Sequence, residues 1–161
     1  MKKEQRTLSL KSVSESFNQV EHLIEEVCNE YNLNHNYLGC IITSVNEAFQ
    51  NALIHGNKNV AEKLISISFK KIATGITFSV TDEGDGFNYK DIPEVNDKAK
   101  ELVFPGRGLF LIKSLSDDVA FNEKGNEISL GFKISSINIE TAIDRVEKFQ
   151  EYSKPEQKLA K

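Results

Sequence analysis

Hydrophobic residues in the first third of the chain recur at the spacing of amphipathic helices. Apolar positions three and four residues apart predict one helix over about 16–31 and a second over about 34–54. Ser16 and Gln19 have the spacing of a capping box at the start of the first helix. Gly56 is well placed to end the second helix, because glycine tolerates the backbone conformations that terminate helices. Two consecutive helices are therefore expected before residue 57.

Five short segments instead alternate apolar and polar residues, which predicts strands with one buried face. They are TLSLKS at 7–12, LISISFKK at 64–71, GITFSVTD at 75–82, DDVAFN at 117–122 and EISLGFKI at 127–134. Only short turns separate the second segment from the third and the fourth from the fifth, so each pair is expected to form an antiparallel hairpin. Strands that alternate cleanly are covered on one face only.

These elements together predict an α+β fold, a two-layer sandwich with helices on one face of a mostly antiparallel mixed β-sheet. They argue against a doubly wound parallel fold, in which helices cover both faces. The segment after Ile134 has only a weak helical stripe and ends in polar residues. We therefore expect a domain over 1–136 and a helical or disordered extension over 137–161.

Composition excludes some classes of protein but does not indicate which reaction or ligand is involved. The chain has 161 residues, a net charge of -4 and 39% hydrophobic residues, which fits one globular domain. The acidic balance argues against a nucleic-acid-binding protein. Cys28 and Cys40 form no CxxC pair and are interpreted as reduced thiols of a cytoplasmic protein. No signal peptide or long apolar run predicts export or a membrane span.

One polar line interrupts the second predicted helix. In VNEAFQNALIHGN, at 45–57, Glu47, Asn51 and His55 recur every four residues beside an otherwise apolar stripe. Side chains four residues apart on a helix are neighbours. The line is either an ordinary solvated face or a set of polar groups directed at a ligand, and the helix alone does not decide between them.

Two glycine clusters follow, TDEGDGF at 81–87 and FPGRGLFLIKSL at 104–115. Neither matches a Walker A loop or a dinucleotide fingerprint. A calcium loop starting at Asp82 would place Pro93 where its glutamate belongs. Either cluster alone is as easily explained by a glycine-rich turn.

Taken in order, E-x-x-x-N-A-x-x-H-G, D-x-G-x-G-F and G-R-G-L-F-L-I-x-x-L-x-D resemble the N, G1 and G2 boxes of the GHKL ATPase superfamily, which has the Bergerat ATP-binding fold. The resemblance covers roughly residues 7–134. The short loop between the boxes and the NALIHG segment look most like the anti-sigma-factor serine/threonine kinase branch of that superfamily.

The resemblance implies roles for the polar line. Asn51 would be the ligand of Mg²⁺, an ion that prefers hard oxygen donors. Glu47 would be the general base that activates a substrate hydroxyl or a water. His55 would lie near the phosphates or polarise the end of the helix. The cofactors implied are ATP and Mg²⁺.

The resemblance also assigns the glycine clusters. The Asp82 carboxylate would accept a hydrogen bond from the adenine amino group, and Gly84 and Gly86 would let the backbone approach the base. The phosphates would lie at the start of the following helix, where backbone N–H groups converge. The residues expected there are Gly106, Arg107, Gly108 and Leu109.

The chain departs from the family pattern in its last hairpin. Family members often carry a threonine directly after the glycine there, whereas Gly125 is followed by Asn126 and Glu127. Thr81 and Ser129 are the two candidates for a similar adenine contact. Beyond Asp82, the adenine contacts stay open.

By resemblance, the partners are a small anti-anti-sigma-like antagonist protein, which is phosphorylated, and a sigma factor, which is sequestered. A homodimer is expected as well, and residues 88–105 are expected to form a lid that nucleotide orders. Two alternatives remain: a non-catalytic, ATP-gated partner-binding switch, and a histidine-kinase-type ATPase domain. The second would require a phospho-accepting helical hairpin upstream, and only about six residues precede the first predicted strand.

Overall fold

The computed structural model describes residues 2–87 and 106–152. In chain order its elements are β1 (Gln5–Lys11), a 3-10 turn η1 (Ser14–Ser16), α1 (Phe17–Glu30), α2 (His35–Asn51), a π-helical turn η2 (Ala52–Gly56), β2 (Leu64–Ile72), β3 (Gly75–Thr81), α3 (Gly106–Leu115), β4 (Asp118–Phe121), β5 (Glu127–Lys133) and α4 (Ser135–Tyr152).

The five strands form one sheet in the order β1-β2-β3-β5-β4. Both predicted hairpins are present, β2 with β3 and β4 with β5, and β3 pairs with β5 to join them. Phe78 of β3 lies between Phe69 of β2 and Leu130 of β5 in this register. Every pair among the described strands is antiparallel, so the parallel pair implied by a mixed sheet is not found there.

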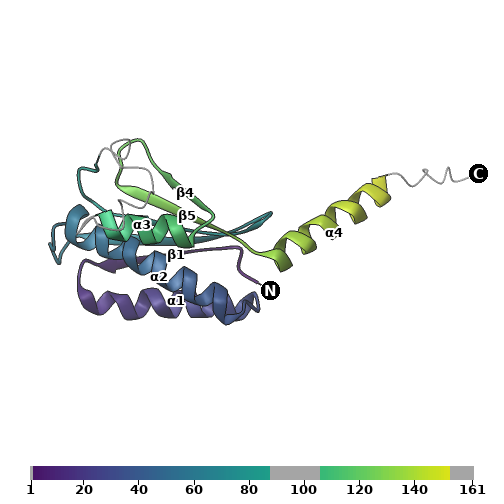
Figure 1. The fold of residues 1–161 in the computed structure, drawn as a ribbon, viewed down its shortest axis with the longest axis horizontal. Helices are drawn as coiled ribbons and strands as arrows, with labels where there is room; N and C mark the ends of the chain where they lie inside the picture. The colour runs from purple at the N-terminus through teal and green to yellow at the C-terminus, as the bar shows by residue number, and fades with distance from the viewer. Residues whose placement is uncertain (1, 88–105, 153–161) are drawn as a thin grey trace, which may run out of the picture.

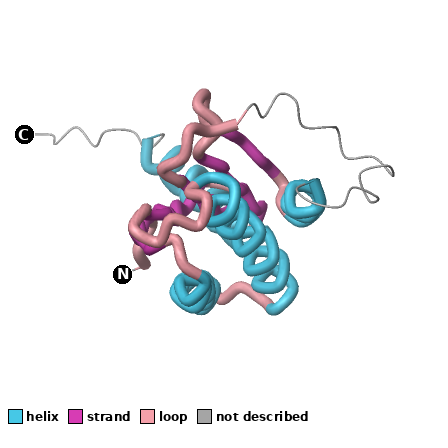
Figure 2. Tube along the Cα trace, turned by 90° about the vertical axis from the view of Figure 1, so that its left-hand side faces the viewer, coloured by secondary structure: helices cyan, strands magenta, loops and turns pink. Residues whose placement is uncertain are grey.

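The helices α1, α2 and α3 lie on one side of the sheet (Figures 1 and 2). Alternate residues of the three central strands point into this helical layer and are buried: Ile65, Ile67, Phe69, Ile76, Phe78, Val80, Ile128, Leu130 and Phe132. The intervening residues on the opposite face of these strands are mostly serine and threonine. The predicted α+β fold with one covered sheet face is confirmed.

The two helix starts are stabilised differently. Asn34 caps α2, because its side-chain oxygen accepts hydrogen bonds from the N–H groups of Asn36 and Tyr37. The predicted capping box at Ser16 is wrong. Its hydroxyl instead donates to the backbone oxygen of Lys11 at 2.8 Å, tying the start of α1 to the end of β1.

The helix that carries the polar line does not continue unchanged to Gly56. After Asn51 it widens into the π-helical turn η2, which closes with a 2.7 Å bond from Asn57 N–H to the Ala52 oxygen. A π-helical turn inserts an extra residue into the helical repeat and frequently occurs at functional sites. Residue 55 is therefore displaced from the face that residues 47 and 51 share.

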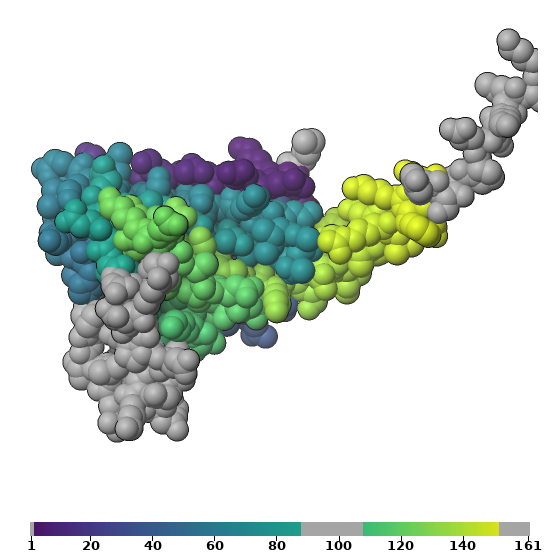
Figure 3. All heavy atoms as spheres, turned by 90° about the horizontal axis from the view of Figure 1, so that it is seen from above, coloured from purple at the N-terminus to yellow at the C-terminus, as the bar shows by residue number. Residues whose placement is uncertain are grey.

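The C-terminal helix α4 leaves the body at one end of the sheet (Figures 1 and 3). Its first turn is anchored, since Ile137 is buried and the preceding Ile134 N–H donates to the Thr74 oxygen at 2.9 Å. The weak helical stripe predicted after Ile134 is thus a helix. The expected lid over 88–105 lies outside the described residues. No helix among the residues that the structure describes is long and apolar enough to cross a membrane.

Candidate functional site

A cavity of about 470 Å³ opens between the end of α2, the loop after β3, the start of α3 and the β4–β5 hairpin. This volume is in the range of small-molecule sites. Its apolar wall consists of Val80, Phe87, Leu109, Phe121 and Ile128. The Phe87 and Phe121 rings meet edge to face, with centroids 5.4 Å apart. Flat apolar walls of this kind suit an aromatic base.

Asp82 supplies a carboxylate to this cavity, at the point where β3 ends. Its Oδ1 accepts the Gly84 N–H at 2.7 Å. Burial raises the pKa of Asp82, while the Gly84 hydrogen bond and the more distant Lys124 and Lys63 charges partly oppose the rise. Asp82 is thus a half-buried, partly desolvated hydrogen-bond acceptor in a mainly apolar cavity.

Two glycines make room for this carboxylate. A Cβ on Gly56 would lie 2.3 Å from the Asp82 Cγ, and one on Gly84 would lie 2.3 Å from the Gly56 oxygen. The backbone of η2 and the loop after β3 therefore approach at distances that no side chain permits. Gly56 does end the helical segment, but its φ is not positive, and its contact with Asp82 is the stronger reason for a glycine.

The other wall of the cavity is closed by two turns with positive φ. Gly86 has a φ of +81° and Gly125 a φ of +78°. A Cβ on Gly86 would lie 1.8 Å from the Lys124 oxygen, and one on Gly125 would lie 2.1 Å from the Phe87 oxygen. The turn after β3 and the β4–β5 turn are thus packed backbone against backbone, which fixes Phe87 beside the cavity.

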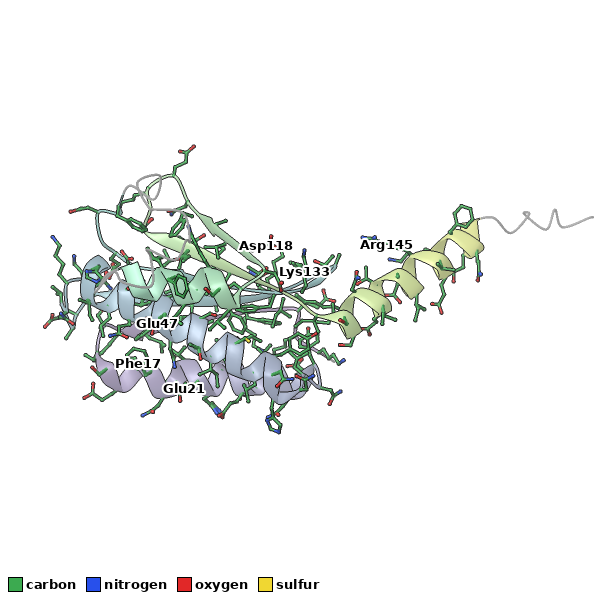
Figure 4. The ribbon with its side chains drawn as sticks, in the orientation of Figure 1. Phe17, Glu21, Glu47, Asp118, Lys133 and Arg145 are labelled. Atoms are coloured by element: carbon green, nitrogen blue, oxygen red, sulfur yellow. The ribbon has the colours of Figure 1, made fainter. Side chains whose placement is uncertain are left out.

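The polar line meets the second glycine cluster. A Cβ on Gly108 would lie 2.8 Å from the Glu47 Oε2 and 3.5 Å from both side-chain heteroatoms of Asn51. Gly108 is in the first turn of α3, whose N-terminal N–H groups are suited to bind anions. Asn51 lines the cavity, and Glu47 lies beside Gly108 at its edge. Figure 4 shows Glu47 on α2 next to α3.

The remaining predicted residues fall into two groups. His55 is exposed and lines the cavity, as does the neighbouring Lys58. Leu109 contributes to the apolar wall. Gly106 and Arg107 form the start of α3, and the Arg107 side chain lies outside the described part of the structure. Its expected contact with phosphate stays a prediction.

Asn126 was missed as a functional residue. Its side chain donates to the Asp82 backbone oxygen at 2.9 Å, and its own backbone oxygen accepts the Asp82 N–H at 2.9 Å. Asn122 in turn donates to the Asn126 side-chain oxygen at 2.7 Å. Asn126 therefore holds Asp82 in place. In the sequence, its position directly after a hairpin glycine indicates only a turn, not a contact with Asp82.

The two hydroxyls considered for an adenine contact lie elsewhere. Thr81 donates to the Glu127 carboxylate at 2.7 Å, and the Ser129 hydroxyl lies 2.8 Å from that of Ser79. Neither Thr81 nor Ser129 lines the cavity. Their strand positions alternate with the buried Val80 and Ile128, so they lie on the sheet face away from the helices.

The buried Asn57 was also missed. It has zero exposure. Its amide nitrogen donates to the Ser12 hydroxyl at 2.6 Å and the Leu64 oxygen at 3.0 Å, and its side-chain oxygen accepts the Glu83 N–H at 2.8 Å. These bonds join the end of η2 to the loop after β3. Asn57 therefore fixes the position of the Asp82 loop relative to the polar line.

The donor set fits a magnesium nucleotide. Mg²⁺ is commonly held by one or two side chains together with phosphate oxygens and water. The Asn51 amide, beside the N-terminus of α3, provides one hard oxygen where an anion would bind. Within residues 2–87 and 106–152 no group of three or more His, Cys, Asp or Glu residues forms a metal cluster of its own. Asp82 and the apolar wall provide an acceptor and a surface for a base.

Comparison with known proteins agrees with this geometry. A family model described as a histidine kinase-like ATPase domain matches residues 11–132. The chain is 33% identical over 114 residues to the serine-protein kinase RsbW of Staphylococcus aureus strain MSSA476, an alignment that covers 65% of this chain and 70% of that protein. For RsbW of strain JH9 the identity is 34% with the same coverage. The resemblance inferred from the three boxes is confirmed: the chain belongs to the histidine kinase-like ATPase domain family, among the relatives of the RsbW serine-protein kinases.

Proposed function

We propose that this chain is an ATP-dependent protein serine/threonine kinase of the anti-sigma-factor type. The observation that carries the proposal is the junction at Gly108. The absence of a side chain there lets the start of α3 lie against the Glu47 carboxylate and the Asn51 amide. The same cavity carries Asp82 beside its apolar wall. One site thus combines a hydrogen-bond acceptor for a nucleobase, a helix N-terminus suited to phosphates, an amide suited to a metal ion and a carboxylate suited to act as a general base.

The base-binding end would select adenine. Asp82, as a carboxylate, would accept a hydrogen bond from the exocyclic amino group of adenine. Guanine presents a carbonyl at that position, which would face the carboxylate without a proton between them. An unpaired buried acceptor costs about 1–3 kcal/mol, enough to discriminate against GTP. Gly84 and Gly86 allow the backbone approach, and Asn126 keeps the carboxylate aligned.

The phosphate end would carry the chemistry. Asn51 would hold Mg²⁺, which when bound neutralises phosphate charge. The N-terminal N–H groups of α3, at Gly106, Arg107 and Gly108, would orient the phosphates. The Glu47 carboxylate would take the proton from a substrate serine or threonine hydroxyl as its oxygen bonds to the γ-phosphorus and ADP leaves. His55, at the exposed mouth of the cavity, would contribute near the phosphates.

The partners follow from the family. The phosphorylation substrate would be a small anti-anti-sigma-like antagonist protein, and the sequestered partner a sigma factor. A homodimer is proposed on the same ground. The boundary between a catalytic domain over 1–136 and an extension over 137–161 is consistent with the family match, which ends at residue 132.

Isothermal titration calorimetry tests the nucleotide site directly. Wild type should bind ATP with Mg²⁺, and GTP should not compete. Asp82→Asn should weaken ATP binding by roughly 10-fold or more, as expected for losing a charged hydrogen-bond acceptor. Asn51→Ala should weaken only the magnesium-dependent part. Asp118→Asn, an exposed carboxylate on the edge strand β4, is the matched control and should leave binding unchanged. Unchanged ATP affinity in Asp82→Asn would contradict the adenine assignment.

Phosphate transfer separates the kinase from an ATP-gated binding switch. Purified chain with labelled ATP and the cognate antagonist should label a serine or threonine of the antagonist. Antagonist binding that depends on ATP without any labelling would instead identify a switch. Acid-labile labelling on histidine would identify a histidine-kinase-type ATPase domain.

A further inference from the structure

The chain makes a left-handed turn directly after η2. Lys58 has a φ of +52° and Asn59 a φ of +58°, and neither residue is a glycine. This backbone conformation is unfavourable for L-residues, with asparagine a partial exception and lysine not. Strain of this kind persists where the surrounding structure enforces it, and it clusters at ligand-binding sites. The conformation of Lys58 therefore points to a role for its side chain.

Hydrogen bonds on both sides of Lys58 enforce this turn. Before it, the Asn57 N–H donates to the Ala52 oxygen at 2.7 Å. After it, the Asn59 N–H donates to the Leu53 oxygen at 2.9 Å. The buried side chain of Asn57 adds three further bonds to neighbouring segments. The backbone of Lys58 is thus fixed between two bonded neighbours.

The fixed turn places Lys58 on the wall of the cavity, where the residue is exposed. Among the described residues that line the cavity, Lys58 is the only lysine or arginine. The side chains of opposite charge on that wall are the carboxylates of Asp82, Asp85 and Glu127. A nucleotide stays anionic even with Mg²⁺ bound, so a cavity lined by three carboxylates needs a positive group to hold its phosphates.

The Lys58 ammonium is left for a ligand. Within residues 2–87 and 106–152, no carboxylate lies within ion-pair distance of it. The lysines whose charges act on the Asp82 carboxylate are Lys124 and Lys63. Lys58 is not one of them, so its charge is placed for a part of the ligand other than the base.

We propose that Lys58 is a further nucleotide-binding residue, whose ammonium pairs with the phosphates of bound ATP. The inference rests on the proposed function and adds a cation to that site. The N–H groups at the start of α3 would bind the phosphates from one element, and Lys58 would bind them from the turn after η2. Charge-assisted contacts of this type are stronger than those between neutral groups. Lys58 would hold the nucleotide and take no part in the proton transfer assigned to Glu47.

Nucleotide titrations of Lys58→Gln test this contact. Calorimetry should show the affinities for ADP and ATP, each with Mg²⁺, lowered roughly 10-fold, as expected for losing a charged hydrogen-bond donor. Adenosine has no phosphate and should bind Lys58→Gln and wild type equally in an NMR titration. Lys70→Gln is the matched control and should change none of these affinities, because Lys70 is exposed on β2, on the sheet face away from the helices.

The outcomes separate this inference from the function on which it rests. Unchanged ADP and ATP affinities in Lys58→Gln, with wild type binding both, would overturn the role of Lys58 and leave the nucleotide site standing. Equal weakening of adenosine would also overturn it, because the contact would then be with the base or the ribose. A wild type that binds no adenine nucleotide would contradict the proposed function and this inference together.

Lys58→Gly separates the ligand contact from the stability of the fold. Glycine adopts a positive φ without strain, so this variant should unfold in urea no more easily than wild type. It should nevertheless lose ADP affinity as Lys58→Gln does. Lys58→Arg keeps the positive charge at an exposed position and should retain most of the affinity. A Lys58→Gly variant that binds ADP as wild type does, or a Lys58→Arg variant as weak as Lys58→Gln, would overturn the ion pair.

Discussion

Gly108→Ala is the smallest change that reaches the proposed catalytic pair. It adds one methyl group, whose carbon would lie 2.8 Å from the Glu47 Oε2 and 3.5 Å from the Asn51 side-chain heteroatoms. Ordinary contacts of this type begin at 3.4 Å, so the Glu47 carboxylate must retreat by about 0.6 Å. A carboxylate at the end of a flexible side chain can move this far at little cost to the fold.

The expected effects on stability and catalysis are therefore opposite. Replacing glycine by alanine in a helix favours folding by up to about 1 kcal/mol. A catalytic group misplaced by about 1 Å costs ~10²-fold in rate, so a shift of about half that size should slow phosphate transfer roughly 10-fold. The contact with Asn51 is ordinary, and ATP affinity should change little.

Gly39→Ala is the matched control. Gly39 is an exposed position of α2, and a Cβ there meets nothing within 4 Å. It provides the same gain in helix propensity without touching the site. Chemical denaturation should show neither variant destabilised, and single-turnover transfer from labelled ATP should slow in Gly108→Ala alone. Equal transfer rates in the two variants would refute the placement of Glu47 at the reacting atoms.

Three further predictions follow from individual contacts. Because burial raises the pKa of Asp82, the folded chain binds the proton of this carboxyl group more tightly than the unfolded chain does. As the pH rises from 3.8, the ordinary pKa, wild type should therefore lose stability relative to Asp82→Asn, measured by urea unfolding without nucleotide. A difference in unfolding free energy that stays constant with pH would contradict the raised pKa. Asn126→Ala, which removes the 2.9 Å bond to the Asp82 oxygen, should cost about 1 kcal/mol of unfolding free energy and weaken ATP several-fold by calorimetry; unchanged affinity would exclude a positioning role. Asn57→Ala, which removes three buried side-chain bonds, should lower the unfolding free energy by about 3 kcal/mol, and a loss under about 1 kcal/mol would show that water replaces them.

The strands and the covered face of the sheet were predictable from sequence, because alternation of apolar and polar residues directly encodes which face is buried. The observed strands differ from the predicted segments by at most two residues at an end. The polar line on α2 and the two glycine clusters were also predictable, but only as a set. Each is ambiguous alone, and their order along the chain is what carries the family signal.

The contacts that assemble the site were not predictable in the same way. Asn57 and Asn126 act through partners up to 45 residues away in sequence, and an isolated asparagine near a turn has no periodicity that reveals such a partner. The π-helical turn after Asn51 also has no simple sequence signature. At Ser16, a short-range pattern predicted a capping box, but the hydroxyl bonds to the end of β1 instead.

The most direct test of Glu47 as the general base is phosphate transfer to the antagonist by Glu47→Gln at saturating ATP. The amide keeps the size of the side chain but cannot accept the hydroxyl proton. This variant should bind ATP as wild type does and transfer phosphate ~10²–10⁴-fold more slowly, the range for loss of a general base. Transfer at the wild-type rate would contradict the assignment of this cavity as the site of a kinase whose base is Glu47.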